Sequence, residues 1–469
     1  MAMDSDLASM GLVELGRQIG KRKLSPVEVT RFMLERIERL QPKLKCYATV
    51  MAEQAVRQAR RCEREIMQGR VRGPLHGVPV AVKDLCNTKG TVTAAGIPMF
   101  RNRVPTHDAT VVTRLREAGA VLLGKLQLTE GALALHHPNV DPPVNPWSRN
   151  RWSGASSSGA GAASAAGLAY GTLGSDTGGS IRFPAFANGV VGLKPTWGRV
   201  SRYGVFPLSE TLDHVGPLTR SVEDAAAMLR AIAGRDRNDP SSSSVAVPDY
   251  LRGIRKGIKG VRVGFDRKYA MTGAHPEVRK MLERVLRTLK AAGTVIVTFT
   301  MPDVKPAIDA WTPICTAEAA LAHADSYPAK KRGYSDVYGG FLTAGRAVTG
   351  MEYARAEIAR RNFRGQMNEV FQSIDLMLTP IVGILNPTIK EFYALCAKEN
   401  GLADLIYYTC VNDMTGAPTI TLPAGLDKNG SPLAFQLVGR HFEEALLCRA
   451  GHVWQSAADW RGLRPPLAA

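Results

Sequence analysis

The amino-acid sequence predicts an α/β fold built on a mostly parallel or mixed β-sheet. Stretches with helical periodicity alternate with short β-branched stretches along most of the chain, which is typical of this fold class. Hydrophobic residues make up 45% of the 469 residues and charged residues 22%, as in globular proteins with a sizeable core. The length would hold two or three average domains, but large α/β enzymes often run this long as one.

The first helix and strand signals lie in the N-terminal quarter. Ser25 begins a predicted helix as its N-cap, with Pro26 in the first turn and Glu28 placed to close a capping box. The apolar residues that follow share one helix face: Val29, Met33, Ile37 and Leu40. Residues 77–84, GVPVAVKD, predict a buried strand, and residues 108–125 predict a helix followed by a strand.

The same alternation continues further along the chain. Residues 221–234 predict a helix with a serine cap and a glycine stop. Residues 260–266 and 293–300 predict strands, and the helix between them covers residues 276–293. The polar, serine-rich stretch 234–250 predicts a surface loop inside one domain, because helices and strands resume after it.

Charge and hydropathy limit the partners of the chain. The net charge of +18 raises nucleic acid, anionic lipid or an acidic substrate as partners. The basic residues are scattered without interleaved aromatic residues, so we expect a solvated basic surface and no nucleic-acid partner. No signal peptide is evident and no run approaches ~18 apolar residues, so we expect a cytoplasmic protein with no membrane partner.

Cysteine and histidine residues give no metal signal. The seven cysteines show no CxxC spacing, so we expect reduced and mostly buried thiols. His136 and His137 are adjacent, which points their side chains in different directions, and no partner ligand is near in sequence. We therefore expect no metal site there.

Residues 153–185 form a Gly-, Ala- and Ser-rich stretch that could be a tether, a phosphate loop or the seat of a nucleophile. A tether would be polar throughout, whereas this stretch carries apolar residues, and its middle, AGAASAAG, suits a tightly packed helix. A phosphate loop would need a Lys followed by Ser or Thr, which is missing. The favoured interpretation is a loop in which Gly178 and Gly179 direct backbone N–H groups around a nucleophilic Ser180.

Such a serine needs a base, and none of the nine histidines lies in these motifs. Lys83 follows an apolar strand that would bury it, and burial disfavours the charged ammonium, so the neutral amine becomes a proton acceptor. The alternative for Lys83 is an ion pair with Asp84 at the end of the strand.

Several motifs, taken in order, resemble the amidase signature family. They are GPLHGVPVAVKDL (73–85), the stretch 153–205, LDHVGPLTRSVEDAAAML (212–229), TGAPTITLPAG (415–425) and AFQLVGRHFEEALLCRAGHVWQ (434–455). The resemblance runs from about residue 6 to residue 456 and is weakest over 300–410. It implies one domain over 1–469 with a mixed central sheet covered by helices on both faces, and a helical segment, 1–70, packed on it.

The resemblance also implies a Ser–cisSer–Lys triad and no metal or organic cofactor. The nucleophile maps to Ser180, the bridging serine 24 residues earlier to Ser156, and the lysine to Lys83. Because three serines follow one another here, Ser157 is the second choice for the bridge. The same match implies that the backbone N–H groups of Thr177, Gly178, Gly179 and Ser180 stabilise the oxyanion. It also implies that Asp176 and Arg182 support the loop.

The implied activity is hydrolysis of a small or aryl/alkyl amide, or of a carbamate (urethane), through an acyl-enzyme. The first alternative is the A subunit of a tRNA-dependent glutamine amidotransferase; a basic nucleic-acid-binding protein without catalysis is a remote one. Residues 129–136 differ from that subunit's typical stretch, and Gly131 and Leu135 suggest a wider, more apolar acyl site. The expected partner is a small molecule, and monomer and homodimer both stay open.

The variable region 305–410 is expected to form much of the pocket wall. Its aromatic residues either line the pocket or pack in the core: Trp311, Tyr334, Tyr338, Phe341, Phe392, Tyr407 and Tyr408.

Overall fold

One large mixed β-sheet runs through the molecule. The structure is a computed structural model, and it describes residues 7–458 and 460–468. Within these residues eleven strands form a single sheet in the order β1-β3-β2-β4-β6-β5-β10-β11-β9-β7-β8. The strands are β1 (Tyr47–Val50), β2 (Pro79–Lys83), β3 (Val121–Leu126), β4 (Thr172–Asp176), β5 (Val191–Lys194), β6 (His214–Thr219), β7 (Arg262–Phe265), β8 (Val295–Thr298), β9 (Leu376–Pro380), β10 (Thr419–Leu426) and β11 (Pro432–Gly439).

Parallel and antiparallel pairs share this sheet. Strand β2 is parallel to both β3 and β4, and β7 is parallel to both β8 and β9. The pairs in the middle, from β4 across β6, β5, β10 and β11 to β9, are antiparallel. The predicted mixed sheet is therefore confirmed.

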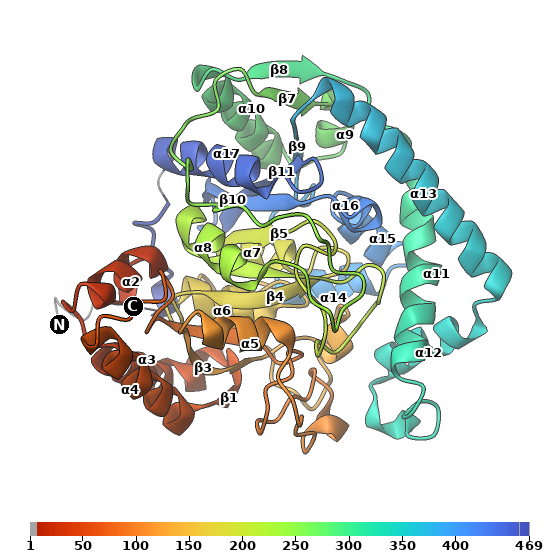
Figure 1. The fold of residues 1–469 in the computed structure, drawn as a ribbon. Helices are drawn as coiled ribbons and strands as arrows, with labels where there is room; N and C mark the ends of the chain where they lie inside the picture. The colour runs from red at the N-terminus through yellow and green to blue at the C-terminus, as the bar shows by residue number, and fades with distance from the viewer. Residues whose placement is uncertain (1–6, 459, 469) are drawn as a thin grey trace.

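Helices flank the sheet on both faces, as predicted (Figure 1). They are α2 (Leu12–Gly20), α3 (Pro26–Leu44), α4 (Ala52–Met67), α5 (Thr110–Glu117), α6 (Ser158–Ala165), α7 (Arg182–Asn188), α8 (Val222–Ile232), α9 (Arg267–Met271), α10 (Pro276–Ala291), α11 (Lys305–Ala322), α12 (Asp336–Ala347), α13 (Gly350–Ser373), α14 (Ile389–Cys396), α15 (Gly401–Ile406), α16 (Cys410–Thr415) and α17 (Glu444–Ala457). Helix α13 runs along the outside of α11, to the right in Figure 1.

The start of α3 forms as predicted except for its capping box. The Ser25 hydroxyl accepts the backbone N–H groups of Val27 and Glu28. That hydroxyl donates to Glu63 of α4. Only half of the predicted capping box forms, because the Glu28 N–H reaches the Ser25 hydroxyl but the Glu28 carboxylate does not accept the Ser25 N–H.

Helices α6 and α7 approach each other closely, which explains the small residues of the Gly/Ala/Ser stretch. A Cβ atom on Gly161 would lie 2.6 Å from the Asn188 side chain and 2.8 Å from the Pro184 carbonyl oxygen, so a larger residue would push the helices apart. The predicted tightly packed helix is confirmed as α6. Helix α6 begins directly after Ser157, and α7 begins two residues after Ser180, so both helices start at predicted site residues.

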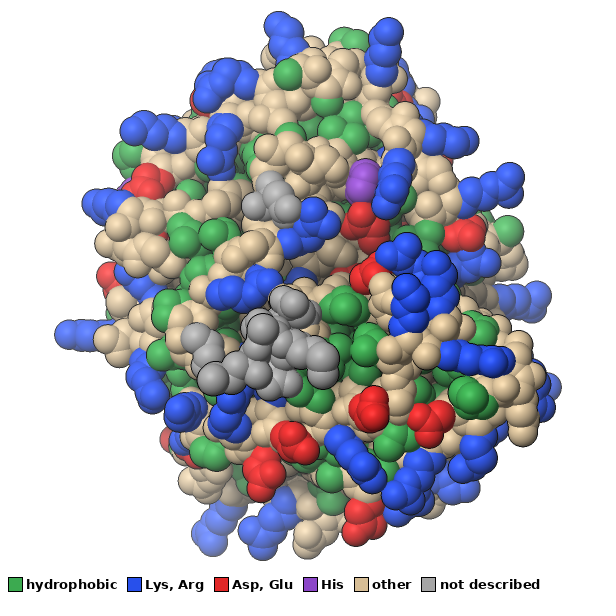
Figure 2. Space-filling view, turned by 90° about the vertical axis from the view of Figure 1, so that its left-hand side faces the viewer, with side chains coloured by type: hydrophobic (Ala, Val, Ile, Leu, Met, Phe, Trp, Pro, Cys, Tyr) green, Lys and Arg blue, Asp and Glu red, His purple; other side chains and the backbone are tan. Residues whose placement is uncertain are grey.

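The domain limits stay a prediction, although residues 234–250 hold neither a helix nor a strand. In the described part of the chain, no helix has the length and apolar character that crossing a membrane requires. Figure 2 shows Lys and Arg side chains spread over one face, with Asp and Glu between them.

Candidate active site

Lys83 ends strand β2 with its amino group among serine hydroxyls. Its Nζ atom lies 2.6 Å from the Ser156 Oγ atom and 2.8 Å from the Ser175 Oγ atom. The side chains of Lys83 and Ser156 are fully buried, and Ser175 is 3% exposed. Ser175 belongs to β4, and the parallel pairing of β2 with β4 places it beside Lys83. Sequence reasoning missed Ser175, because nothing in the chain order reveals that β2 and β4 are neighbours.

Burial changes the protonation of this lysine. Desolvation lowers the pKa of Lys83 to about 7, and the more distant charges of Asp213 and Asp176 offset only part of that effect. The alternative ion pair with Asp84 is wrong: the Asp84 carboxylate faces Lys125, with 3.1 Å between Oδ1 and Nζ. Lys83 therefore has a serine hydroxyl within hydrogen-bond distance instead of a carboxylate.

The three consecutive serines have different surroundings. The peptide bond between Ala155 and Ser156 is cis, and Ser156 is the one whose hydroxyl contacts Lys83. The Ser157 hydroxyl is bonded to the backbone of Ser175, accepting from its N–H and donating to its carbonyl oxygen, each at 3.2 Å. The Ser158 hydroxyl has another partner, with its Oγ atom 3.0 Å from the Nε2 atom of His136. Of the two serines considered for the bridge, only Ser156 contacts Lys83.

Ser180 sits in the short loop between β4 and α7, and it is 9% exposed. The Ser157 N–H donates to the Ser180 carbonyl oxygen at 3.3 Å, which ties the two predicted segments together. The Asp176 carboxylate holds the loop by accepting the N–H groups of Gly179 at 2.7 Å and Ile181 at 2.9 Å. The predicted oxyanion role of Gly179 is therefore corrected: its N–H already has an acceptor three residues back in its own loop.

A buried ionic cluster supports the same loop. The Arg182 guanidinium lies 2.8 Å from Asp176 and 2.6 Å from Asp413, and all three side chains are fully buried. Burial opposes ionisation of Asp176, but Arg182 outweighs it and holds the pKa of that carboxyl below its ordinary value. Arg182 also donates to the Thr409 carbonyl oxygen at 2.8 Å. Sequence reasoning named Asp176 and Arg182 as loop supports and missed Asp413 and Thr409.

Hydrogen bonds of the Thr177 hydroxyl and of the Thr177 and Gly178 carbonyl oxygens hold these two residues in place. The Thr177 carbonyl oxygen accepts from the Trp311 indole at 2.9 Å, and the Gly178 carbonyl oxygen accepts from the Thr409 hydroxyl at 2.5 Å. The Thr177 hydroxyl donates to Asp213 at 2.5 Å. Burial raises the pKa of Asp213 to about 6, and the bond from Thr177 offsets part of that rise. These bonds turn both carbonyl oxygens toward the protein, where they are already satisfied.

A small apolar cavity of about 30 Å³ opens beside Ser180. Its lining comes from six parts of the chain: Ala132, Leu133, Ala134, Ala155, Thr177, Gly178, Phe183, Leu208, Trp311, Leu402, Leu405 and Ile406. Trp311, one of the aromatic residues considered for the pocket wall, lies in this lining. The lining contains no charged side chain within the described residues.

The five pocket residues singled out from the sequence lie outside that lining. Tyr338 packs behind the segment 131–135, with its hydroxyl donating to the Gly131 carbonyl oxygen at 3.3 Å. The rings of Tyr334 and Phe341 each stack on the Tyr338 ring, at centroid distances of 5.9 and 6.3 Å. The Leu135 carbonyl oxygen accepts the Glu130 N–H at 2.9 Å. Contact of these residues with substrate stays a prediction.

Among the described residues, no group of three or more His, Cys, Asp or Glu side chains is arranged to hold a metal ion.

Comparison with known proteins gives the family of this chain. A family model described as "Amidase" matches residues 28–448. The chain is 44% identical over 466 residues to "Putative amidase AmiD" of Mycobacterium tuberculosis, covering 99% of this chain and 98% of that protein. It is 36% identical over 481 residues to the A subunit of the glutamyl-tRNA(Gln) amidotransferase of Geobacter metallireducens, covering 97% of this chain and 98% of that relative.

A solved structure agrees with these relatives. The native peptide amidase of Stenotrophomonas maltophilia is 29% identical and superposes with a TM-score of 0.82, covering 97% of this chain and 98% of that one. The fold and the sequence therefore lead to one conclusion, which confirms the resemblance: this chain is an amidase and belongs to the amidase signature family.

Proposed function

We propose that this amidase cleaves its substrate through a covalent acyl-enzyme on Ser180. The observation that carries the proposal is the contact of the buried Lys83 amino group with the Ser156 hydroxyl at 2.6 Å. A pKa of about 7 leaves a large fraction of Lys83 neutral at neutral pH, so the amine is able to accept a proton. Ser156 is the relay between that amine and Ser180.

The proposed steps move one proton along this relay. Neutral Lys83 takes the Ser156 proton while Ser156 takes the Ser180 proton, and the Ser180 oxygen bonds to the carbonyl carbon. The negative charge on the carbonyl oxygen is stabilised by the N–H groups of Thr177, Gly178 and Ser180. The relay then returns the proton to the leaving nitrogen, the carbon–nitrogen bond breaks and the amine departs.

Water completes the cycle by the same path. It gives a proton to the relay, attacks the acyl carbon, and releases a carboxylic acid and the free Ser180 hydroxyl. A carbamate would pass through a carbamoyl- or alkoxycarbonyl-enzyme with the same groups. These steps use only groups of this chain and water.

The apolar lining of the cavity supports an uncharged acyl group. Leu133, Phe183 and Trp311 lie around Ser180, and their apolar side chains suit an uncharged acyl group. We therefore assign small or aryl/alkyl amides, with carbamates as the second class. Assaying p-nitroanilides, short aliphatic amides and aryl carbamates with the chain alone tests this assignment, and turnover confined to charged acyl groups would contradict it.

The A subunit of an amidotransferase is the second candidate function, favoured by the 36% identity over nearly the full length. Glutamine carries an α-ammonium and an α-carboxylate that need charged or polar partners, and the cavity lining, within the residues the structure describes, offers no charged side chain. Ammonia release from glutamine, measured with and without partner subunits, separates the two. Strict dependence on partner subunits would establish the second candidate.

A further inference from the structure

A second cavity, of about 240 Å³, lies at the far ends of the two helices that begin at the active site. Its floor includes residues 165–167, where α6 ends, and residues 188–190, where α7 ends. An eight-residue helix is about 12 Å long, which separates this cavity from Ser156 and Ser180. Residues 460–468 of the C-terminal segment contribute much of its cover. Nothing in the proposed mechanism uses this cavity.

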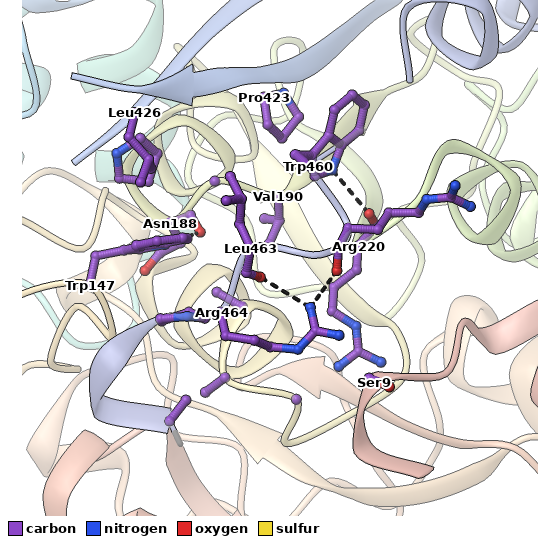
Figure 3. A pocket seen from close by; sticks show the side chains of 18 of the residues that line it. Ser9, Trp147, Asn188, Val190, Arg220, Pro423, Leu426, Trp460, Leu463 and Arg464 are labelled. Atoms are coloured by element: carbon purple, nitrogen blue, oxygen red, sulfur yellow. Dashed lines mark hydrogen bonds between the residues drawn. The ribbon is translucent and has the colours of Figure 1, made fainter. Parts of the chain in front are cut away.

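Most of the cavity wall is apolar and aromatic. Figure 3 shows Trp147 and Trp460 at two sides, with Val190 and Leu463 between them in the view. Both indole N–H groups are already bonded to backbone carbonyl oxygens, those of Asn188 at 2.8 Å and Arg220 at 3.2 Å. The Trp rings therefore offer apolar surface and not hydrogen bonds.

Four guanidinium groups also line the cavity, those of Arg36, Arg220, Arg461 and Arg464. Within the described residues, no carboxylate forms an ion pair with Arg36, Arg220 or Arg464. They donate instead to backbone carbonyl oxygens, of Ala166, Gly167 and Ala468 for Arg36, of Ala8 and Met10 for Arg220, and of Arg461 and Leu463 for Arg464.

Each guanidinium carries five N–H donors, so each keeps some beyond these bonds. Burial, and then the charges of Arg39, Arg220 and Arg464, lower the pKa of Arg36, whereas the Asp224 carboxylate opposes the effect of burial on the pKa of Arg220 and offsets only part of it. A bound anion would offset the repulsion among these arginines, and a guanidinium pairs with a carboxylate through two parallel N–H···O bonds.

We infer that this cavity binds a small organic carboxylate with an apolar or aromatic body. The carboxylate lies against the guanidinium groups of Arg220 and Arg464, and the body lies between Trp147 and Trp460. The volume is just below the usual range of about 300–1,000 Å³ for small-molecule sites, so the body is limited to about one ring with a short chain.

Calorimetry with 4-(4-bromophenyl)butanoate tests the site, and the uncharged 4-(4-bromophenyl)butan-1-ol tests the need for the anion. Arg464→Gln removes a guanidinium on an exposed side chain that donates to the carbonyl oxygens of residues 461 and 463. We expect the alcohol to bind at least tenfold more weakly than the acid. Arg464→Gln should lower the affinity for the acid by about tenfold or more, since one charge-assisted hydrogen bond is lost. The matched control is Arg252→Gln, at an exposed arginine outside the cavity. The affinity of this variant for the acid should equal that of the unmodified chain.

Crystals of the unmodified chain with the brominated acid locate the ligand directly, whatever the folding of the variants. The anomalous bromine signal should lie between Trp147 and Trp460. Absence of binding at millimolar acid, equal affinity for acid and alcohol, or bromine beside Ser180 as a product-like ligand would each overturn the inference.

Discussion

The Nζ atom of Lys83 lies 2.6 Å from the Oγ atom of Ser156, and both side chains are fully excluded from solvent. Burial holds the pKa of this lysine at about 7 instead of its ordinary value near 10.5. The neighbouring Asp84 does not restore it, because its carboxylate is paired with Lys125. The base beside the relay serine is therefore a desolvated lysine.

The first prediction concerns pH. Because the pKa of Lys83 is lowered, the neutral form grows as pH rises and is nearly complete one to two units above the pKa. We expect kcat/KM to rise with pH through an apparent pKa of about 7 and then level off. Lys83→Arg, which stays protonated, should lose about 10²- to 10⁴-fold in kcat at every pH. A flat profile between acid and alkaline pH would contradict this role of Lys83.

The second prediction separates two adjacent serines. Ser156→Ala removes the hydroxyl next to Lys83, so kcat should fall by about 10²- to 10⁴-fold, with a loss of about 1–3 kcal/mol in unfolding free energy for the buried hydrogen bond. Ser157→Ala removes two bonds to the backbone of β4, so stability should fall by about 1–3 kcal/mol and kcat by much less. Steady-state kinetics and urea unfolding of both variants measure the contrast. The reverse ranking of the two kcat values would make Ser157 the bridge.

The third prediction concerns the ionic support of the nucleophile loop. Asp176→Asn leaves the buried Arg182 with Asp413 as its remaining carboxylate, so we expect a loss of about 3–5 kcal/mol in unfolding free energy. The matched control is Asp249→Asn, which removes an exposed ion pair with Arg230 and should cost at most about 1 kcal/mol. Urea unfolding measures both, and equal costs would show that the buried cluster does not hold the loop.

The fourth prediction concerns the segment beside the cavity. Gly131 has a φ of 54°, and a Cβ atom there would lie 2.2 Å from the Tyr338 ring, so Gly131→Ala must displace one of the two. Residues 132–134 line the cavity, and we expect kcat/KM to fall along with a stability loss of about 1–3 kcal/mol. Gly340→Ala in α12 meets no atom within 4 Å and should be neutral or stabilise by up to ~1 kcal/mol. An active, stable Gly131→Ala enzyme would contradict the close fit to Tyr338.

Local signals in the sequence are sufficient to predict many elements. The Ser25 cap and the apolar face of α3, the buried strand before Lys83 and the small residues of α6 all follow from neighbours in the chain. The run of glycines around Ser180 likewise indicates a turning loop from its own residues. These features depend on periodicity, capping and side-chain size, which the sequence displays directly.

The remaining features depend on contacts between distant segments. Ser175 reaches Lys83 because β4 pairs with β2, and Asp413 reaches Arg182 across more than 200 residues of chain. The sequence predicts the Gly179 N–H as an oxyanion donor, but the Asp176 side chain accepts it. A glycine-rich sequence shows that the loop is able to turn N–H groups inward, and it does not show which acceptor each of them meets.

The most direct test of the central claim is mass spectrometry of the enzyme quenched during turnover of an aryl ester or activated amide. We predict that a peptide containing Ser180 gains the mass of the acyl group, and that Ser180→Ala shows neither the adduct nor turnover while it unfolds like the unmodified chain. An adduct on another residue, or full turnover by Ser180→Ala, would contradict the account.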